Sequence, residues 1–421
     1  MNTQLRNKIT KQNIAMVDYV LNRIAELQNS GDKPRTIFAA CPNSISVIRA
    51  SLRSAKRCNA PIKFAATLNQ VDIDGGYTGM NQEEFVKTIR HEAKKINFTG
   101  PIMIAVDHGG PWLKDKHKID NYSYEKAMNG VKKSFEASIA AGFDLLHVDP
   151  TIDIRLAKNE IIDIDTVADR TIELIVAAEK FRTDNNYPPI SYEVGTEEVH
   201  GGLADYTVFE RFLKLLKDGL IKEGIDYVFP CLVVAKVGTD LHTTLFDKKV
   251  AKEVTSICRN YGSVIKGHYS DNVDNPEDYP LSGMGGANVG PEFTEKEYEG
   301  LIELQSLEAD YYEKGKVIKK SAIKETLWKN VIASNRWQKW LGSNENPNDF
   351  YANGKERQEW LVKTGCRYIW ENPEVLVARK ILYDNLKDNN VDAEHVVLSK
   401  IEQAMDKYFY NFNLVNLNNK L

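Results

Sequence analysis

The stretch PIMIAVDHGGP, residues 101–111, joins an apolar run to an aspartate, a histidine and a turn. The run PIMIA predicts a short buried strand. Gly-Gly-Pro is sufficient to turn the chain at once, so folding alone does not require the Asp107–His108 pair before it. The pair therefore indicates chemistry at the end of a strand, and the fold class depends on how often such strands recur.

Similar apolar, β-rich runs recur along the chain with helical stretches between them. Eight runs can be counted, at residues 36–40, 62–67, 101–107, 145–150, 190–195, 227–238, 263–268 and 286–290. The helical stretches lie at residues 44–57, 82–96, 122–141, 165–182, 206–219 and 247–259, and one more at 293–307 follows the eighth run. Alternation of strands and helices predicts a parallel sheet, and eight units predict closure into a (β/α)8 TIM barrel. An open doubly wound sheet is the alternative.

Helical segments flank the expected barrel on both sides. Residues 12–29 have the spacing of an amphipathic helix, and beyond residue 308 the strands stop. The later stretches with helical spacing are 321–341, 355–365, 373–386 and 393–412. We predict an α/β fold in which residues 1–307 form the barrel with an N-terminal helix and residues 308–421 form a helical C-terminal extension. Five of the six tryptophans lie in this extension. We expect them to pack on the barrel or on another subunit, and a substrate contact by one of them is the alternative.

The composition argues against several classes of protein. The 421 residues are 42% hydrophobic and 27% charged with a net charge of −4, which is typical of a packed globular chain. No Lys/Arg-rich run points to nucleic acid, no apolar segment approaches a membrane span, and the N-terminus lacks an apolar signal core. Five scattered cysteines indicate reduced thiols, so we expect a cytoplasmic protein. The absence of a Gly-rich phosphate loop with a lysine argues against a sugar kinase.

Polar residues gather at the predicted carboxyl ends of the strands, where TIM barrels form their active sites. Three of them, His108, His242 and His268, follow the third, sixth and seventh strands. Three imidazoles with carboxylates between them suit a divalent metal, above all zinc, and leave coordination positions open for catalysis. His147 lies one layer deeper, two residues before Asp149, and we expect it to make a hydrogen bond in the core instead.

Two connections between strands carry further signals. The second strand leads into TLNQVDIDGGYTGM, residues 67–80. Its GGYTGM segment is a candidate backbone cradle for a hydroxyl or a phosphate, and a plain glycine-rich turn is the alternative. The seventh connection, residues 269–285, is long and rich in proline and glycine, so we expect it to move as a lid over the site.

Five motifs together resemble the Z subunit of class II tagatose-bisphosphate aldolases. They are NQVDIDGGYTGM, DHGGP, AGFDLLHVD, SYEVGTE and GHYSDN, in this order, and the resemblance covers residues 35–305. More distantly, the strand ends resemble the class II, zinc-dependent fructose- and tagatose-bisphosphate aldolases. Relatives of the Z subunit include ketose 4-epimerases, and the Z subunit itself has also been regarded as a noncatalytic partner.

The resemblance implies a role for each strand-end residue. Asp107 would be the catalytic acid/base. Asp149 and Glu193 match carboxylates that support the metal ligands or contact an alternative metal, and we assign Asp149 to the metal site and Glu193 to the catalytic groups. The residues expected to hold the metal are His108, His242, His268 and Asp149. The residues expected to bind substrate are Asn69, Gln70, Gly76, Tyr77, Asp271 and Asn288.

The sequence departs from the wider class II pattern in two places. Those aldolases follow the third histidine with a Gly-Gly-Ser phosphate loop, where this chain has HYSD. They follow the asparagine of the eighth strand with Asp-Thr, where this chain has NVGPEFT. An ionised Asp271 beside a phosphate would repel it unless a cation intervened.

The sequence leaves two hypotheses for function. The first is a metal-dependent enzyme of carbohydrate metabolism that acts on a ketose or ketose phosphate of tagatose or fructose type, by retro-aldol C3–C4 cleavage or by C4 epimerisation. Asp107 would take and return the C4-hydroxyl proton in either reaction. The second is a noncatalytic subunit that stabilises a separate tagatose-bisphosphate aldolase chain. We expect a small sugar or sugar phosphate as ligand, a homo-oligomer and, under the second hypothesis, an aldolase partner subunit.

Overall fold

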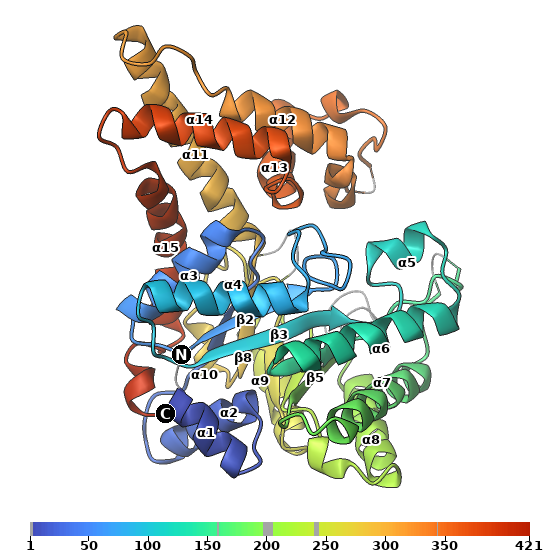
Figure 1. Ribbon diagram of the computed structural model, residues 1–421. Helices are drawn as coiled ribbons and strands as arrows, with labels where there is room; N and C mark the ends of the chain where they lie inside the picture. Colours follow the sequence, from blue (N-terminus) through green and yellow to red (C-terminus); the bar gives the residue numbers. More distant parts are fainter. Residues whose placement is uncertain (1–2, 158–159, 197–204, 240–243, 343) are drawn as a thin grey trace.

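The strands close into a barrel. The computed structural model describes residues 3–157, 160–196, 205–239, 244–342 and 344–421. Eight parallel strands pair in sequence order, and β1 pairs with β8 to close the sheet. Figure 1 shows strands of the barrel, among them β2, β3 and β8, in the middle of the molecule with helices around them. The strands are β1 (Ile37–Ala40), β2 (Ile62–Thr67), β3 (Ile102–Gly109), β4 (Leu145–Val148), β5 (Ser191–Gly195), β6 (Leu232–Val234), β7 (Val264–Gly267) and β8 (Gly286–Val289). The predicted (β/α)8 barrel is confirmed, and the open sheet is excluded.

The strand register brings distant polar residues together. Nearly every strand residue is buried, as in parallel sheets that are covered on both faces. Thr67 pairs with Asp107 across β2 and β3, and His147 pairs with Glu193 across β4 and β5. These residues therefore meet at the carboxyl ends of neighbouring strands.

Helices alternate with the strands around the barrel. They are α3 (Ile45–Arg57), α4 (Gln82–Lys95), α5 (Asp115–Ile119), α6 (Tyr124–Ala141), α7 (Ile164–Asp184), α8 (Tyr206–Lys222), α9 (Lys248–Arg259) and α10 (Asp278–Leu281). Polar caps fix several starts: Ser44 accepts from a backbone N–H of α3, and Asn81 and Glu84 form a capping box on α4. The predicted helical stretches are confirmed within a few residues, whereas the short α5 and α10 were not predicted.

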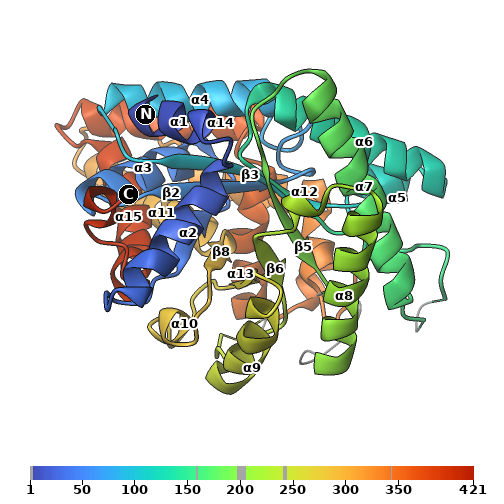
Figure 2. The same ribbon diagram turned by 90° about the horizontal axis from the view of Figure 1, so that it is seen from below.

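The N-terminal helices α1 (Thr3–Lys11) and α2 (Met16–Asn29) lie beneath the barrel (Figure 2). Ser191 at the start of β5 donates its hydroxyl to Asp18 of α2. Arg6 of α1 forms an ion pair of 2.8 Å with Asp144, just before β4. These helices cover the amino ends of the strands, so the cavity described below lies at the opposite end.

The helix after β8 leaves the barrel and starts the C-terminal extension. The helices of the extension are α11 (Pro291–Glu313), α12 (Ile323–Ser334), α13 (Lys355–Gly365), α14 (Pro373–Lys387) and α15 (Ala393–Asn411). Residue 307, where we predicted the division, lies within α11. α12, α13 and α14 gather above the barrel, and α15 returns along α11 and α3 (Figure 1). There Tyr408 stacks on Phe38 of β1 with ring centroids 5.5 Å apart, so the end of the chain is anchored in the barrel.

The seventh connection, residues 269–285, is packed into the molecule. Ser270, Val273, Tyr279 and Met284 are fully buried. The hydroxyls of Tyr279 and Tyr408 each donate a hydrogen bond of 2.9 Å to Ser270, to its Oγ and its carbonyl oxygen respectively. This burial counts against the prediction of a mobile lid, because opening would expose these side chains and break these bonds.

Candidate active site

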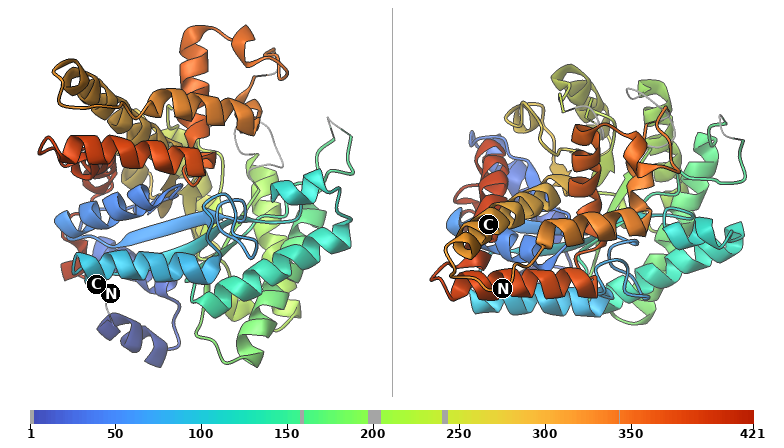
Figure 3. Two further views of the ribbon diagram at one scale, coloured as in Figure 1. Left: turned by 45° about the horizontal axis from the view of Figure 1, so that its top comes forward. Right: turned by 90° about the horizontal axis from the view of Figure 1, so that it is seen from above.

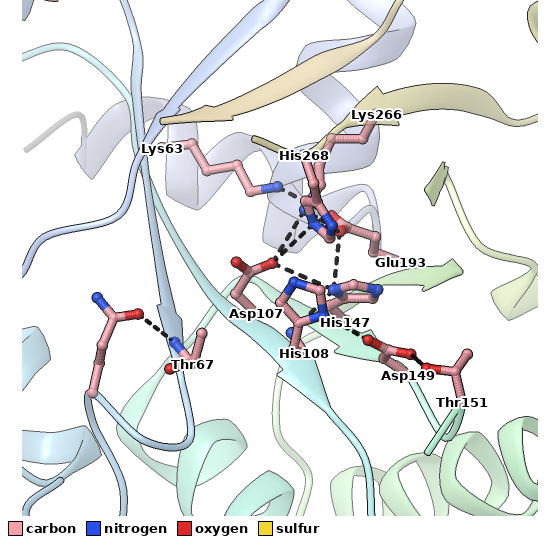
Figure 4. A network of polar contacts seen from close by, with 11 residues as sticks. Lys63, Thr67, Asp107, His108, His147, Asp149, Thr151, Glu193, Lys266 and His268 are labelled. Atoms are coloured by element: carbon pink, nitrogen blue, oxygen red, sulfur yellow. Dashed lines mark hydrogen bonds and ion pairs between the residues drawn. The ribbon is translucent and has the colours of Figure 1, made fainter. Parts of the chain in front are cut away.

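The Asp-His-Gly-Gly stretch at the end of β3 turns within the barrel wall. His108 has a left-handed backbone conformation with φ 50°, and the pairing of β3 with β4 shifts register between Val106 and Gly109. A Cβ on Gly110 would lie 1.8 Å from the carbonyl oxygen of Asp149, so only glycine fits there. Asp107 and His108 consequently both point toward the cluster of charged side chains in Figure 4.

Two buried lysines pair with the carboxylates of this cluster. Lys266 Nζ lies 3.2 Å from Asp107 Oδ1 and also contacts Glu193, and Lys63 Nζ lies 3.3 Å from Glu193 Oε2 (Figure 4). All four side chains are almost completely buried, where an unpaired charge would be strongly destabilising. Neither lysine is among the predicted site residues. The signal that could have found them is a lysine inside an apolar strand, as in IKFAAT and SVIKGH.

The lysines keep the carboxylates ionised. Burial raises the pKa of Asp107, but the positive charges of Lys266 and the nearby histidines outweigh it and hold this pKa well below its ordinary value. Burial also raises the pKa of Glu193, and Lys266 and Lys63 lower it by more. Burial lowers the pKa of Lys266, but Asp107 and Glu193 raise it above its ordinary value. Around neutral pH, Asp107 is therefore a carboxylate and Lys266 an ammonium group.

Three imidazole rings converge beside these charges. The ring centroids of His108 and His268 are 4.3 Å apart, and that of His147 lies 5.0 Å from His108 and 5.4 Å from His268. His268 Nε2 lies 3.4 Å from Asp107 Oδ1. Two of the three histidines predicted to hold a metal thus meet at the strand ends, while the third, His242, lies outside the described residues.

His147 makes the core hydrogen bond that we expected of it. Its Nδ1 accepts the backbone N–H of His108 at 3.0 Å. Burial lowers the pKa of His147, although Glu193 and Asp107 oppose this effect. A neutral imidazole that accepts at Nδ1 carries its proton on Nε2. His147 therefore supports the backbone that presents His108.

Asp149 contacts His108 directly. Asp149 Oδ2 lies 2.5 Å from His108 Nδ1, and Thr151 donates its hydroxyl to Asp149 Oδ1 at 2.6 Å. Burial raises the pKa of Asp149, but the contact with His108 outweighs it and the pKa falls to about 2. A carboxylate on one ring nitrogen is the arrangement that orients metal-binding histidines. Asp149 is thus placed to orient the ring of His108.

The donor atoms at the strand ends fit a divalent metal. Two overlapping groups have ligand atoms within 4.8 Å of one another: Asp107, His147, Glu193 and His268, and His108, His147 and Asp149. Mixed imidazole and carboxylate donors suit zinc or a similar ion. Lys63 and Lys266 already neutralise Asp107 and Glu193, so a dication is less favoured between those two carboxylates than beside His108 and His268.

A cavity of about 220 Å³ opens at the carboxyl ends of the strands. The predicted site residues that line it are Asn69, Gln70, Tyr77, Asp107, His108, His268, Asp271 and Asn288. Gly76 is not in the lining. A Cβ at Gly76 would lie 2.3 Å from the carbonyl oxygen of Gln70, so this glycine is required by the turn. Glu193 and Asp149 are buried behind the lining residues that they contact.

The amides that follow β2 are used within the protein. Asn69 donates to the carbonyl oxygen of Leu113 at 3.0 Å and accepts the backbone N–H of Asp115 at 2.8 Å. Gln70 donates to the carbonyl oxygen of Pro42 at 2.9 Å. These bonds connect the loops that follow the first three strands and shape the cavity wall. Substrate contact by Asn69 and Gln70 stays a prediction.

Asn288 differs from those amides because its own amide atoms are unsatisfied. Its side chain is 4% exposed, and neither amide atom has a hydrogen-bond partner among the described residues. A buried amide without partners is unfavourable, and a polar ligand in the cavity would satisfy it. This observation supports the predicted substrate contact by Asn288.

Asp271 faces the start of α11. Its Oδ1 accepts the backbone N–H groups of Gly290 at 2.9 Å and Glu292 at 2.8 Å. Burial raises the pKa of Asp271 to about 7, and the nearby Glu292 carboxylate adds to the effect. The side chain thus occupies a helix N-terminus, a place that otherwise attracts phosphate. Its own hydrogen bonds weigh against the predicted role in binding substrate.

The helices of the C-terminal extension lie over the barrel (Figure 3). The extension supplies the remaining wall of the cavity. The lining residues from the 3-10 helices η2 (Arg336–Trp340) and η4 (Cys366–Tyr368) are Arg336, Lys339, Trp340, Arg367 and Tyr368. None of them is among the predicted site residues. We expected the tryptophans of the extension to pack on the barrel or on another subunit, with a substrate contact by one of them as the alternative. Because Trp340 lines the cavity, its position supports that alternative.

The fold and the polar cluster at the strand ends define a TIM-barrel protein with a site at the carboxyl ends of its strands. Residues 21–411 match the family described as D-tagatose-1,6-bisphosphate aldolase subunit GatZ/KbaZ-like, and the chain belongs to this family. The resemblance inferred from the five motifs is confirmed. Membership supports an aldolase-like function in carbohydrate metabolism.

Solved structures share the architecture. A probable tagatose 6 phosphate kinase from Sinorhizobium meliloti 1021 superposes with a TM-score of 0.73 at 21% identity, over 90% of this chain and 100% of that chain. The fructose-bisphosphate aldolase of Campylobacter jejuni superposes with a TM-score of 0.53 at 12% identity, over 95% of this chain and 94% of that chain. At these identities the likeness concerns the fold. No helix in the described parts of the chain is long and apolar enough to cross a membrane.

Proposed function

We propose that this protein is a metal-dependent, aldolase-like enzyme that acts on a ketose or ketose phosphate of tagatose or fructose type. The reaction is retro-aldol cleavage of the C3–C4 bond or epimerisation at C4. One observation carries the proposal: Asp107, His108 and Asn288 line the same cavity and offer it a carboxylate, an oriented imidazole and an unsatisfied amide.

Asp107 is the proposed acid/base. As a carboxylate beside the cavity it accepts the C4-hydroxyl proton when the C3–C4 bond breaks, and it returns the proton when the bond forms again. The low pKa of Asp107 makes it a weak proton acceptor that gives the proton back readily. Lys266, held between Asp107 and Glu193, keeps the carboxylate in place.

The metal site is proposed at His108 and His268, with His242 as the third ligand that the family resemblance implies. A divalent ion held there supplies Lewis-acid polarisation of the ketose carbonyl. The protein's own contribution is to orient the ligands. Asp149 fixes the ring of His108, and His147 fixes its backbone N–H. Zinc as the ion, a homo-oligomeric state and a cytoplasmic location stay predictions.

The fate of the aldehyde decides between cleavage and epimerisation. If it leaves the cavity, the reaction is an aldol cleavage. If it turns and recondenses through its other face, the product is the C4 epimer. Both outcomes use the same proton transfer at Asp107, so the proposal covers both.

The experiment is to purify the chain alone, measure its bound metal, and offer it fructose, tagatose and their mono- and bisphosphates. Product analysis by NMR separates cleavage from epimerisation. Turnover that depends on bound metal is the expected result. A metal-loaded chain that turns over none of these ketoses, but raises the activity of a separate aldolase chain, would support the noncatalytic subunit instead.

A further inference from the structure

Three cationic side chains of the C-terminal extension line the cavity opposite the strand ends. They are Arg336 and Lys339 of η2 and Arg367 of η4. Arg336 and Lys339 share one partner, since Arg336 Nη2 lies 2.6 Å and Lys339 Nζ 2.5 Å from the carboxylate of Asp115. A single carboxylate thus serves two cations.

Arg367 is buried and makes no ion pair among the described residues, although its charge lowers the pKa of Asp271 in the same cavity. It is 8% exposed, its Nε donates to the carbonyl oxygen of Thr364 at 3.0 Å, and its guanidinium lies over Trp340, 4.3 Å from the ring centroid. Its Nη2 has no hydrogen-bond partner, and no carboxylate pairs with it, in the parts of the chain that the structure describes. A buried guanidinium with an unsatisfied N–H group on a cavity wall is costly unless an anion binds there.

The charges on this wall do not balance. Three positive groups face Asp115 and the carboxyl group of Asp271, which leaves an excess of two positive charges when Asp271 is protonated and of one when it is ionised. Burial lowers the pKa of Lys339, and the neighbouring Arg336 and Arg367 lower it further against the effect of Asp115, as expected for crowded cations. A phosphomonoester carries close to two negative charges near neutral pH, whereas a carboxylate carries one.

We propose that Arg336, Lys339 and Arg367 form a phosphate-binding site through which the C-terminal extension recognises a phosphorylated ketose. The assignment rests on the proposed function, because it concerns the substrate of the same cavity. Arg367 supplies the principal contact, since its planar fork of N–H donors suits phosphate oxygens and is not engaged by a carboxylate. Lys339 and Arg336 supply the remaining charge.

This site accounts for the missing Gly-Gly-Ser loop after His268. Asp271 fills the start of α11 with its own carboxyl group, so that helix end is not open to a phosphate. The cations that could receive the phosphate come from the extension instead. The extension is then part of the substrate site and not only a cap on the barrel.

The test measures binding of inorganic phosphate to the full-length, metal-loaded chain by isothermal titration calorimetry. Arg367→Met and Arg336→Met each remove one charge from the site at similar side-chain length. Lys329→Met is the matched control, because it removes a cation from α12 that pairs at the surface with Glu374 at 2.9 Å and does not line the cavity. Circular dichroism checks that each variant is folded. If Arg367→Met is not folded, the phosphate affinity of Arg336→Met decides the test.

Phosphate binding should weaken by about 10- to 100-fold in Arg367→Met, as expected for loss of hydrogen bonds to a charged group, and should be unchanged in Lys329→Met. With a ketose that is turned over, Arg367→Met should lower kcat/KM for the phosphorylated form far more than for the unphosphorylated form. Equal phosphate affinity in all variants, no phosphate binding by the wild type, or tighter binding of acetate than of phosphate would each overturn the site. Because calorimetry needs no turnover, these outcomes are distinct from a failure of the proposed reaction.

Discussion

The backbone N–H of His108 donates a hydrogen bond of 3.0 Å to Nδ1 of His147. The bond joins the end of β3 to β4, and it occupies the nitrogen of His147 that lies nearest to the site carboxylates. It also accompanies the left-handed backbone of His108. His147 is thus placed to act on the proposed metal site through His108.

Replacing His147 by leucine should therefore damage the site without removing a proposed metal ligand. The N–H of His108 loses its acceptor, which should lower the free energy of unfolding by about 1–3 kcal/mol. Metal affinity should fall by about 10- to 100-fold, as is usual when a group that orients a ligand is lost. Denaturant unfolding and metal titration measure the two effects. His91→Leu, at an exposed position on α4, is the control. Unchanged metal affinity in a folded His147→Leu would contradict this role.

The second prediction concerns Asp107, which lines the cavity and contacts Lys266. Asp107→Asn keeps the size of the side chain but removes the carboxylate that accepts a proton. Turnover should fall by about 10²–10⁴-fold, the usual contribution of a positioned acid or base, while metal content stays close to that of the wild type. His108→Ala should instead lose metal and activity together.

Metal analysis and turnover on both variants separate these effects. Asp184→Asn, at the exposed end of α7, serves as the control for an Asp-to-Asn change away from the site. Full activity of metal-loaded Asp107→Asn would remove Asp107 from the mechanism.

The third prediction separates metal chemistry from lysine chemistry. Buried lysines in a barrel can form Schiff bases with ketoses, but only as neutral amines. Asp107 and Glu193 raise the pKa of Lys266 against the effect of burial, so it stays an ammonium group and is a poor nucleophile. Borohydride added with a ketose that is turned over should leave activity unchanged, and mass spectrometry should find no adduct on Lys266 or Lys63.

A chelator should abolish turnover in the same assay, and added zinc should restore it. Untreated enzyme that passes through the same dialysis steps is the control. A ketose adduct on either lysine, together with activity that survives chelation, would replace the proposed metal mechanism with an imine mechanism.

The barrel and part of the site could be predicted because both follow from local pattern and topology. Apolar runs such as PIMIAV predict strands, parallel strands align their carboxyl ends, and Asp107, His108, His268 and Asn288 therefore had to meet there. Lys63 was missed because its partner Glu193 lies 130 residues away, and only the closed barrel brings them to one layer.

The contribution of the extension could not be predicted in the same way. Helical spacing predicts that residues such as 355–365 form a helix, and this is confirmed by α13. It does not specify the direction in which α11 leaves the barrel or the length over which it runs. Those two quantities place Arg367 beside the residues at the strand ends. The burial of side chains in the seventh connection could likewise not be predicted, because its proline- and glycine-rich composition favoured a mobile loop.

The last prediction concerns the pH dependence of stability at Asp271. Burial raises the pKa of Asp271 from 3.8 to about 7, so between these values the folded chain keeps a proton that the unfolded chain releases. Stability from this group is complete below 3.8 and is lost as the pH rises toward 7. Asp271→Asn keeps the acceptor for the N–H groups of Gly290 and Glu292 but cannot ionise. The Tm of the variant relative to the wild type should therefore increase from about pH 5 to about pH 8.

The control is Asp274→Asn, since the side chain of Asp274 accepts a hydrogen bond from Thr244 at the surface, and this variant should show no such increase. A constant Tm difference across this range would mean that Asp271 is ionised in the folded protein throughout, held by the helix start and by Arg367, because only then would its proton add nothing to folding.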